Sequence, residues 1–332
     1  MRAQVLKEFG GPDNFWLETV PNPVVTQGHV LIRVAATSVN TVDTKIRAGL
    51  PIGPALPAIL GADVAGVIVA KGEGVEGFEV GDAVYGCAGG VKGQGGALAE
   101  LMLADAQLIA KKPVSLSMRE AAALPLVAIT AWDALERSRV SEGQTVLVHG
   151  GLGGVGHVAI QLAKARGAKV ATTCSGEGSD ALARSLGADA VIDYKAESVE
   201  GYVQRLTQGS GFDVVFDTIG GANLPTSFAA VAIDGNIATT NARTTQDLSQ
   251  LHARALSLHV VFMLLPMLTG KHRARHGRIL AELAAWVDTS KVKPLIDPHR
   301  FTLATAPDAH RLLESGDAVG KIVIDIDESI AA

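Results

Sequence analysis

The sequence predicts an α/β protein in which a doubly wound parallel sheet is joined to a second, β-rich domain. Residues 144–240 alternate between short apolar runs and helical stretches, which is typical of a parallel sheet with helices on both faces. Residues 1–120 instead hold short β-branched runs separated by many glycines, which indicates an irregular barrel or sandwich. A length of 332 residues is enough for about two domains.

The composition argues against several classes of protein. Hydrophobic residues make up 48% of the chain and charged residues 19%, which is typical of a large folded core. A net charge of −5 gives no reason to expect nucleic acid or an anionic membrane as a partner. Cys87 and Cys174 are too few for a disulfide framework or a four-cysteine metal site, and they fit a reducing cytoplasm.

No segment reads as a signal peptide or a membrane helix. The N-terminus lacks a long apolar region. The strongest apolar run, Leu258–Leu268, contains Pro266 and is much shorter than the roughly 20 residues that a membrane helix needs. We expect a buried strand followed by a loop there, in a soluble cytoplasmic protein.

The expected elements follow in chain order. In the first part, strands are expected at Gly28–Ala35 and Ala62–Ala70, and a helix at Glu120–Arg137. The strands of the alternating region are Gln144–His149, Lys169–Cys174, Ala190–Asp193, Phe212–Thr218 and Asn236–Thr240, and its helices are Val155–Arg166 and Ser179–Leu186. A tail helix at Pro307–Leu313 and a strand at Gly320–Ile326 do not continue the alternation, so this strand is a candidate to return to the first domain.

A glycine-rich turn follows the first strand of the alternating region. Gly151, Gly153 and Gly156 have the G-x-G-x-x-G spacing, with Gly154 and Val155 between them, and a helix begins inside the turn. Such a turn lets a pyrophosphate approach the backbone at the N-terminus of a helix. The alternative is a tight strand-to-helix turn without a ligand, and the complete βαβ context argues against it.

The end of the second strand favours NADPH over NADH. An NAD site usually has an acidic residue at this strand end, and the sequence Thr172–Gly176 has none. Ser175 leaves room for a 2′-phosphate, and Lys195 is the nearest plausible cation. Glu177 lies slightly beyond the strand end and is the residue that would favour NADH.

A series of short motifs then resembles a known family. The motifs are Ser38–Asp43, Pro57–Gly66, Gly81–Gly86, Ala121–Pro125, Thr130–Trp132, the glycine turn and Phe216–Gly221. In this order they resemble the zinc-independent medium-chain dehydrogenases/reductases of the quinone oxidoreductase type, over nearly the whole chain.

The resemblance implies a GroES-like catalytic domain that is interrupted by a Rossmann dinucleotide-binding domain. The catalytic domain would comprise residues 1–122 and 265–332, and the Rossmann domain residues 123–264. It also implies a homodimer formed by edge strands, for which Leu256–Leu264 is the candidate; the alternative is that this segment belongs to the core.

The resemblance also bears on metal. The positions that hold the catalytic zinc in zinc-dependent relatives match Asn40, Ala62 and approximately Leu126, none of which is a good zinc ligand. Zinc catalysis is therefore not expected. Without a Lewis acid, hydride transfer from NADPH is easiest to a quinone or an α,β-unsaturated carbonyl, because the charge of the product is delocalised.

The resemblance assigns catalytic candidates to the first domain. Asn40 would face the nicotinamide and the substrate, and Asp43 would organise the turn, although Asp43 could equally be an ordinary turn or cap residue. Lys45 occupies a position where relatives often carry a tyrosine; it could donate a hydrogen bond to an oxyanion or simply be exposed. The missing tyrosine argues against a thioester enoyl reductase.

Cofactor contacts are implied in the second domain. Thr130 would contact the nicotinamide end, unless it is an ordinary helix hydroxyl, and Tyr194 would lie near the adenosine phosphate or ribose. Thr239 and Asn241 match the loop that passes the cofactor, and Phe262 matches a nicotinamide contact.

Two questions stay open at this point. The basic cluster Lys271–Arg278 contains His272 and His276 at a spacing that a helix could turn into a metal pair, but a solvated basic turn is the better interpretation. Two other functions also remain: a metal-free alcohol or carbonyl dehydrogenase, and a non-catalytic NADPH-binding sensor protein.

Overall fold

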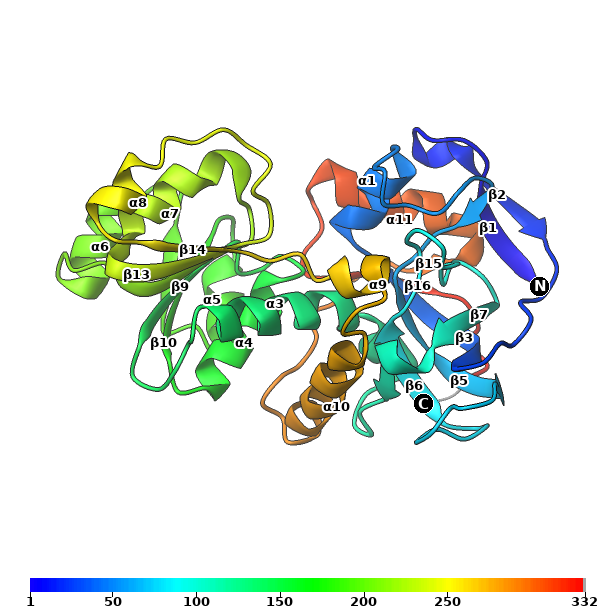
Figure 1. Ribbon diagram of the computed structural model, residues 1–332. Coiled ribbons are helices and arrows are strands. Elements are labelled where there is room, and N and C mark those ends of the chain that lie inside the picture. The colour runs from blue at the N-terminus through cyan, green and yellow to red at the C-terminus, as the bar shows by residue number, and fades with distance from the viewer. Residues whose placement is uncertain (331–332) are drawn as a thin grey trace. The chain divides into compact units, whose positions relative to one another are not determined.

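The computed structural model describes residues 1–330, and their contacts divide into two compact units (Figure 1). One unit contains Met1–Ile129, Leu264–Ser290 and the residues from Pro294 onward; the other contains Thr130–Met263 and Lys291–Lys293. A parallel sheet in the second unit and a separate, largely antiparallel sheet in the first confirm the predicted fold class.

The second unit is built on a six-stranded sheet with the order β11-β10-β9-β12-β13-β14, in which all neighbours are parallel. The strands are β9 (Thr145–His149), β10 (Lys169–Cys174), β11 (Ala190–Asp193), β12 (Phe212–Asp217), β13 (Val231–Thr239) and β14 (Ser257–Val260). The chain runs outward from β9 to β11 and then returns to β12, beside β9. This reversal makes the carboxyl ends of β9 and β12 the place where a ligand is expected.

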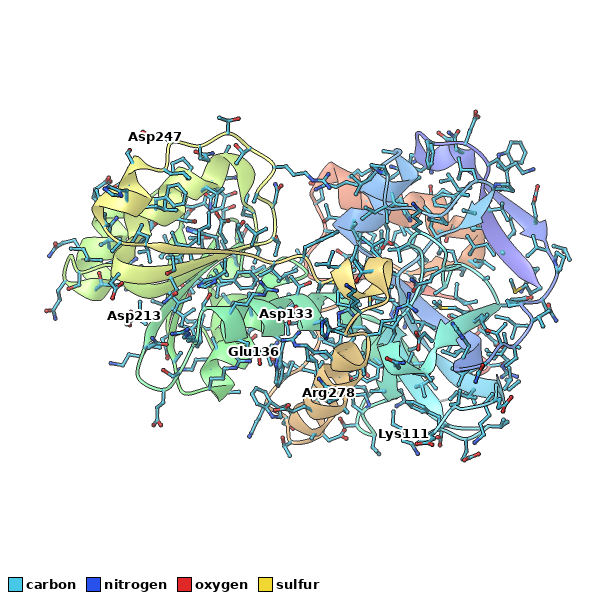
Figure 2. The ribbon with its side chains drawn as sticks, in the orientation of Figure 1. Lys111, Asp133, Glu136, Asp213, Asp247 and Arg278 are labelled. Carbon is cyan, nitrogen blue, oxygen red and sulfur yellow. The ribbon has the colours of Figure 1, made fainter. Side chains whose placement is uncertain are left out.

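Helices cover both faces of this sheet (Figure 1). They are α3 (Pro125–Arg137, shared with the first unit), α4 (Gly156–Ala165), α5 (Ser179–Ser185), α6 (Val199–Thr207), α7 (Leu224–Ala230) and α8 (Ser249–Ala253), with a 3₁₀ turn at Gly221–Asn223. Leu147, Val215 and Ile237 are fully buried in the core on one face. Asp213, labelled in Figure 2, accepts hydrogen bonds from the backbone and the hydroxyl of Thr145 and so ties the start of β12 to β9.

The first unit holds a seven-stranded sheet with the order β15-β16-β3-β5-β6-β8, and β7 also pairs with β3. Its strands are β3 (His29–Val39), β5 (Asp63–Lys71), β6 (Ala83–Cys87), β7 (Leu101–Asp105), β8 (Ile109–Lys111), β15 (Phe301–Thr302) and β16 (Ile322–Asp325). A smaller sheet joins β2 (Phe15–Thr19), β1 (Arg2–Leu6) and β4 (Ala58–Ile59).

The helices of the first unit are short except for one. They are α1 (Thr41–Arg47), α2 (Met118–Ala122), α9 (Leu265–Thr269), α10 (Ala274–Asp288) and α11 (Ala306–Ser315), with 3₁₀ turns at Pro12–Asn14, Ala106–Leu108 and Leu303–Thr305. The predicted tail strand does return to this unit: β16 pairs antiparallel with β3, and Ile322 lies opposite Val39.

Two of the expected elements are wrong. The helix expected at Glu120–Arg137 is two helices, because Pro125 begins α3. The segment Leu258–Leu268 is not a buried strand with a loop: Val260 of β14 is 47% exposed, and Pro266 lies in the first turn of α9.

The basic cluster Lys271–Arg278 is not simply a solvated turn, because α10 begins at Ala274 within it. His276 is buried in that helix, whereas His272 precedes it with a left-handed backbone (φ 62°). The two histidines therefore do not form a pair on one helix face.

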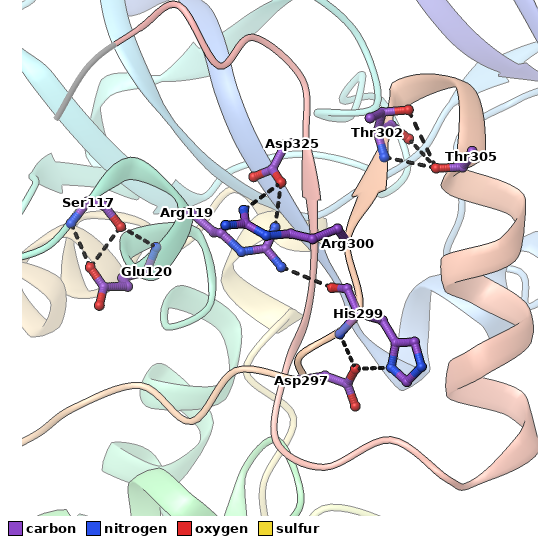
Figure 3. Close-up of polar contacts among 9 residues, drawn as sticks. All are labelled: Ser117, Arg119, Glu120, Asp297, His299, Arg300, Thr302, Thr305 and Asp325. Atoms are coloured by element: carbon purple, nitrogen blue, oxygen red, sulfur yellow. Dashed lines mark hydrogen bonds and ion pairs between the residues drawn. The ribbon is translucent and has the colours of Figure 1, made fainter.

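A carboxylate at the end of β16 fastens this strand to two other segments of the first unit (Figure 3). Asp325 accepts a hydrogen bond of 2.6 Å from Arg119 of α2 and one of 3.2 Å from Arg300, which precedes β15. Arg119 also donates to the backbone oxygen of His299 at 3.1 Å. Because Asp325 is only 7% exposed, these guanidinium groups replace much of the water that would otherwise solvate its carboxylate.

We predict that Asp325→Asn lowers the free energy of unfolding by about 3 kcal/mol, because it leaves the partly buried Arg119 without its carboxylate. Denaturant titration of the purified protein measures this change. The matched control is Asp180→Asn, which breaks the exposed Asp180–Arg184 pair of α5 and should cost less than about 1 kcal/mol. Equal effects of the two variants would contradict a role for burial.

Candidate functional site

The glycine turn lies between β9 and α4 at the carboxyl edge of the parallel sheet. A Cβ atom at Gly151 would lie 2.0 Å from Oγ1 of Thr172, and one at Gly156 would lie 2.1 Å from the backbone oxygen of Gly150. A Cβ atom at Gly153 would meet only that same oxygen, at 3.3 Å, and Gly153 is exposed. The outer glycines therefore permit internal packing, while the middle glycine leaves its backbone open to a ligand.

The turn is held from behind by the neighbouring strands. The hydroxyl of Thr173 accepts a hydrogen bond from the amide of Gly150 at 3.1 Å, and its backbone oxygen accepts one from the amide of Gly151, also at 3.1 Å. Thr218 donates to the backbone oxygen of His149 at 2.7 Å. Burial lowers the pKa of His149, which favours a neutral imidazole next to the turn. Gly154 and Val155 are half-buried and lead into the N-terminus of α4, where unpaired N–H groups can receive a phosphate.

Polar groups meet at the ends of β10 and β11. The hydroxyl of Ser175 donates a hydrogen bond of 3.2 Å to the hydroxyl of Tyr194. The ammonium of Lys195 lies 6.0 Å from the centre of the Tyr194 ring. Glu177 is exposed beyond the strand end. The structure thus brings together Ser175, Tyr194 and Lys195, which are donors that a phosphate could use.

Hydrogen bonds also fix the backbone that follows β12 and β13. Asp217 is fully buried and accepts hydrogen bonds from the amides of Ile219 and Gly220 at 3.0 and 2.8 Å. Thr239 is fully buried, and its hydroxyl accepts a bond of 3.3 Å from the amide of Asn241. The side chain of Asn241 in turn donates to the backbone oxygen of Ile219 at 3.4 Å.

Thr130 and Phe262 belong to the same unit as these contacts. Thr130 is buried in α3, and Phe262, which follows β14, is 43% exposed. Their expected contacts with a nicotinamide remain predictions.

In the first unit, Asn40 and Asp43 lie together at the start of α1. Asn40 is the residue before the helix. Its backbone amide donates a hydrogen bond of 2.9 Å to Oδ2 of Asp43. This bond uses one of the amides that a helix N-terminus leaves unpaired. Lys45 is on the same helix but is exposed, and its role as an oxyanion donor stays a prediction.

A cluster of buried polar side chains surrounds Asn40, and we call Asn40, Asp43, Asp63 and Lys321 the buried polar cluster. Their exposed fractions are 5%, 1%, 0% and 2%. Nδ2 of Asn40 donates to Oδ2 of Asp63 at 2.8 Å, and Nζ of Lys321 donates to Oδ1 of Asn40. Lys321 also donates to the backbone oxygen of Val39 at 2.9 Å and lies 3.6 Å from Asp63.

Asp63 has two further donors. Its Oδ2 accepts a bond of 2.7 Å from the hydroxyl of Ser38, and its Oδ1 accepts a bond of 2.8 Å from the amide of Leu126. Two of the positions matched to zinc ligands, Asn40 and Leu126, therefore donate hydrogen bonds to the carboxylate of Asp63. The third, Ala62, directly precedes Asp63 in the sequence.

Sequence reasoning missed Asp63 and Lys321 as site residues. A signal was present, since each is a charged residue at one end of an apolar strand: Asp63 at the start of β5 and Lys321 just before β16. Such residues are seldom buried without partners.

Burial and neighbouring charges shift the pKa values of Asp43 and Lys321. The pKa of Asp43 is raised to about 7. Burial is the largest cause and the negative charge of Asp63 acts in the same direction, while the hydrogen bond from the amide of Asn40 and the charge of Lys321 act against them. Burial lowers the pKa of Lys321, against the effect of Asp63 and Asp43. Below about pH 7, Asp43 therefore keeps its proton in the folded protein.

Within residues 1–330, no group of three or more histidine, cysteine, aspartate or glutamate side chains is placed to hold a metal ion. None of the helices in this range combines the length and apolar character that a membrane crossing needs.

The chain matches two family profiles. Residues 26–114 match the alcohol dehydrogenase GroES-like domain, and residues 186–324 match the zinc-binding dehydrogenase family.

Three curated relatives are similar over nearly the whole chain. The 2-methylene-furan-3-one reductase of Solanum lycopersicum is 36% identical, over 98% of this chain and 79% of the relative. The NADPH-dependent alkenal/one oxidoreductase of Arabidopsis thaliana is 35% identical over the same shares, 98% and 79%. The quinone oxidoreductase of Rattus norvegicus is 33% identical, over 98% of this chain and 97% of the relative.

Solved structures agree with these relatives. An alcohol dehydrogenase superfamily protein from Novosphingobium aromaticivorans is 42% identical with a TM-score of 0.94, over 98% of this chain and 100% of that protein. The quinone oxidoreductase of Escherichia coli, solved in complex with NADPH, is 25% identical with a TM-score of 0.88, over 98% and 100%.

We predict that Asp43→Asn changes how stability depends on pH. The raised pKa means that folded Asp43 keeps a proton between about pH 4 and 7 while the unfolded chain has lost it, so this group lowers wild-type stability as pH rises through that window. Asparagine carries no such proton. The variant should therefore gain stability relative to wild type by at most about 1.4 kcal/mol per pH unit up to pH 7, and then stay level.

Urea unfolding of both proteins from pH 4 to 9 measures the difference between their free energies of unfolding. Groups that titrate alike in both proteins contribute equally and cancel in this difference. Parallel stability curves for the variant and the wild type would show that Asp43 does not hold the proton.

Proposed function

Because the chain belongs to the medium-chain dehydrogenases/reductases of the quinone oxidoreductase type, we propose that it is an NADPH-dependent reductase of quinones or α,β-unsaturated carbonyls that needs no metal. The observation that carries the proposal is the open glycine turn at the reversal point between β9 and β12. The fold alone would not select this function, because one fold can support many reactions. The names of the relatives limit the substrate to quinones and enones.

The residues of the turn fit a dinucleotide. Gly151 and Gly156 pack the turn against β10 and α4, and the exposed backbone of Gly153 receives the pyrophosphate. When bound, NADPH supplies the hydride of the reaction. Thr239 and Asn241, at the end of β13, line the path of the cofactor. Thr130 and Phe262 bind its nicotinamide end.

The preference for NADPH rests on the ends of β10 and β11. Ser175 and Tyr194 donate hydrogen bonds to the 2′-phosphate, and Lys195 supplies a positive charge. The Arabidopsis relative is named as NADPH-dependent, and the Escherichia coli structure is a complex with NADPH, which supports the same choice here.

The substrate class follows from the donors near Asn40. Asn40 and the backbone of Leu126 bind Asp63, and neither presents a zinc ligand. A carbonyl oxygen that gains charge can then be stabilised only by hydrogen-bond donors, with Asn40 as the first and Lys45 as the second candidate. Quinones and enones suit such a site, because they spread the charge of the product. The names of the three relatives support this class.

We also propose that the protein forms a homodimer through β14. This strand is the last in the order of the six-stranded sheet, so within residues 1–330 one of its edges has no neighbouring strand. Val260 and Phe262, which are 47% and 43% exposed, supply apolar area beside that edge.

The proposed function predicts steady NADPH oxidation with 9,10-phenanthrenequinone and with an alkenal, but not with cyclohexanone. Dialysis against a chelator should leave the rate unchanged. Absorbance at the NADPH band measures each reaction. Ketone reduction would indicate a carbonyl dehydrogenase, and tight NADPH binding without turnover on any acceptor would indicate a sensor protein.

We predict that wild type binds NADPH at least about tenfold more tightly than NADH, and that Ser175→Asp removes this preference. A carboxylate at this position repels the 2′-phosphate and can accept a hydrogen bond from a ribose hydroxyl. Titration of tryptophan fluorescence measures both affinities. The control is Ser185→Asp, the same change at an exposed position of α5, which should preserve the preference.

If wild type prefers NADH, the assignment of Ser175, Tyr194 and Lys195 to a 2′-phosphate is wrong.

A further inference from the structure

We propose that Lys321 is a positioning residue that fixes the carboxamide of Asn40, so that Asn40 offers a hydrogen-bond donor to the substrate carbonyl. The inference rests on the proposed function, because it assumes that Asn40 faces the substrate. It assigns a role to a residue that is itself too deeply buried to touch substrate, at 2% exposed.

The two ends of an asparagine carboxamide have nearly the same shape but opposite hydrogen-bonding capacity. Their orientation is therefore decided by their partners. Asn40 lies between Lys321, whose ammonium can only donate, and Asp63, whose carboxylate can only accept. These opposite partners require Oδ1 to face Lys321 and Nδ2 to face Asp63.

The reversed orientation is strongly disfavoured. It would place the Nδ2 hydrogens against an ammonium and Oδ1 against a carboxylate, inside a region where all three side chains are at most 5% exposed. Unmatched polar contacts in such surroundings are costly. Asn40 therefore has a single orientation, in which Asp63 accepts one of the two Nδ2 hydrogens.

Lys321 forms hydrogen bonds in addition to its ion pair with Asp63. Its Nζ bonds to Oδ1 of Asn40 and to the backbone oxygen of Val39, whereas it is 3.6 Å from the carboxylate of Asp63. The ammonium is thus directed at the residue before α1.

The backbone around Lys321 places it with little freedom. Its amide donates to the oxygen of Leu295 at 2.9 Å, and the next residue, Ile322, pairs with Val39 in the sheet. Gly320 has a left-handed backbone (φ 73°), and a Cβ atom there would lie 2.3 Å from the same oxygen of Leu295. The ammonium is consequently held beside Asn40 by the sheet itself.

The orientation of the Asn40 carboxamide suits hydride addition to a carbonyl compound. Hydride addition places negative charge on the carbonyl oxygen of the substrate, and a preorganised N–H donor stabilises that charge. The ammonium at Oδ1 draws electron density from the amide and strengthens its N–H groups as donors. Lys321 acts through Asn40, and Asn40 touches the substrate.

The experiment uses the full-length protein and the double variant Lys321→Met/Asp63→Asn. Lys321→Met alone would leave Asp63 charged and unpaired, and could prevent folding. The double change removes both charges with little change in volume. An asparagine at position 63 can donate to Oδ1 of Asn40, so it no longer imposes the native orientation.

We expect the double variant to fold and to bind NADPH within about threefold of wild type, while kcat falls about 100-fold, as for removal of one oxyanion donor. In an Asn40→Ala background the same double change should lower kcat no further, because its effect passes through Asn40. Asp325→Asn, which breaks another buried pair of this unit, should lower stability and leave kcat unchanged.

An activity-independent measurement separates this inference from the proposed function. The ¹⁵N side-chain resonance of Asn40 should show one hydrogen protected from exchange in wild type, and should lose that protection or shift in the double variant. If wild type turns over no acceptor, the proposed function fails while this resonance still tests the orientation.

Two results would overturn the inference: a folded double variant with wild-type kcat and an unchanged Asn40 resonance, or an equal loss of kcat in the Asn40→Ala background.

Discussion

The first unit depends on the burial of one charge, the carboxylate of Asp63. A fully buried carboxylate is tolerated only where donors surround it. Its donors come from Ser38 at the end of β3, from Asn40 before α1 and from Leu126 at the start of α3, and Lys321 adds a positive charge before β16. The need to pair one charge therefore sets the position of several elements at once, including the residue that we assign to the substrate.

The second unit differs from the first, because it leaves backbone groups accessible to a ligand. The glycine turn does so by packing tightly on both sides of an open centre at Gly153. Thr173 accepts hydrogen bonds from the amides of Gly150 and Gly151 behind the turn, while Gly153 stays exposed at its front. The first unit thus encloses the charge of Asp63, whereas the second leaves the backbone of Gly153 open.

The sequence predicts the second unit well, because its strands are short apolar runs and its turn has a fixed glycine spacing. Strands β10 and β11 begin and end where the pattern places them. It predicts less of the first unit. Helix α10 was missed because its first turn lies in a basic cluster, and its apolar stripe of Ile279, Leu280 and Leu283 begins only later. The pairing of Lys321 with Asn40 joins positions 281 apart, and no local pattern encodes such a contact.

The pairing of β16 with β3 has a consequence for synthesis on the ribosome. Lys321 and Val39 are 282 positions apart, and the whole second unit is translated between them. The second unit can complete its sheet as soon as it emerges, since all its strands lie close together in the chain. The first unit must wait with residues 36–39 of β3 unpaired on the side that β16 will occupy, and with the carboxylate of Asp63 lacking its cation. The domain that starts first is therefore the last to mature, and the nascent chain carries an open sheet edge during that delay, which is where a chaperone would be needed.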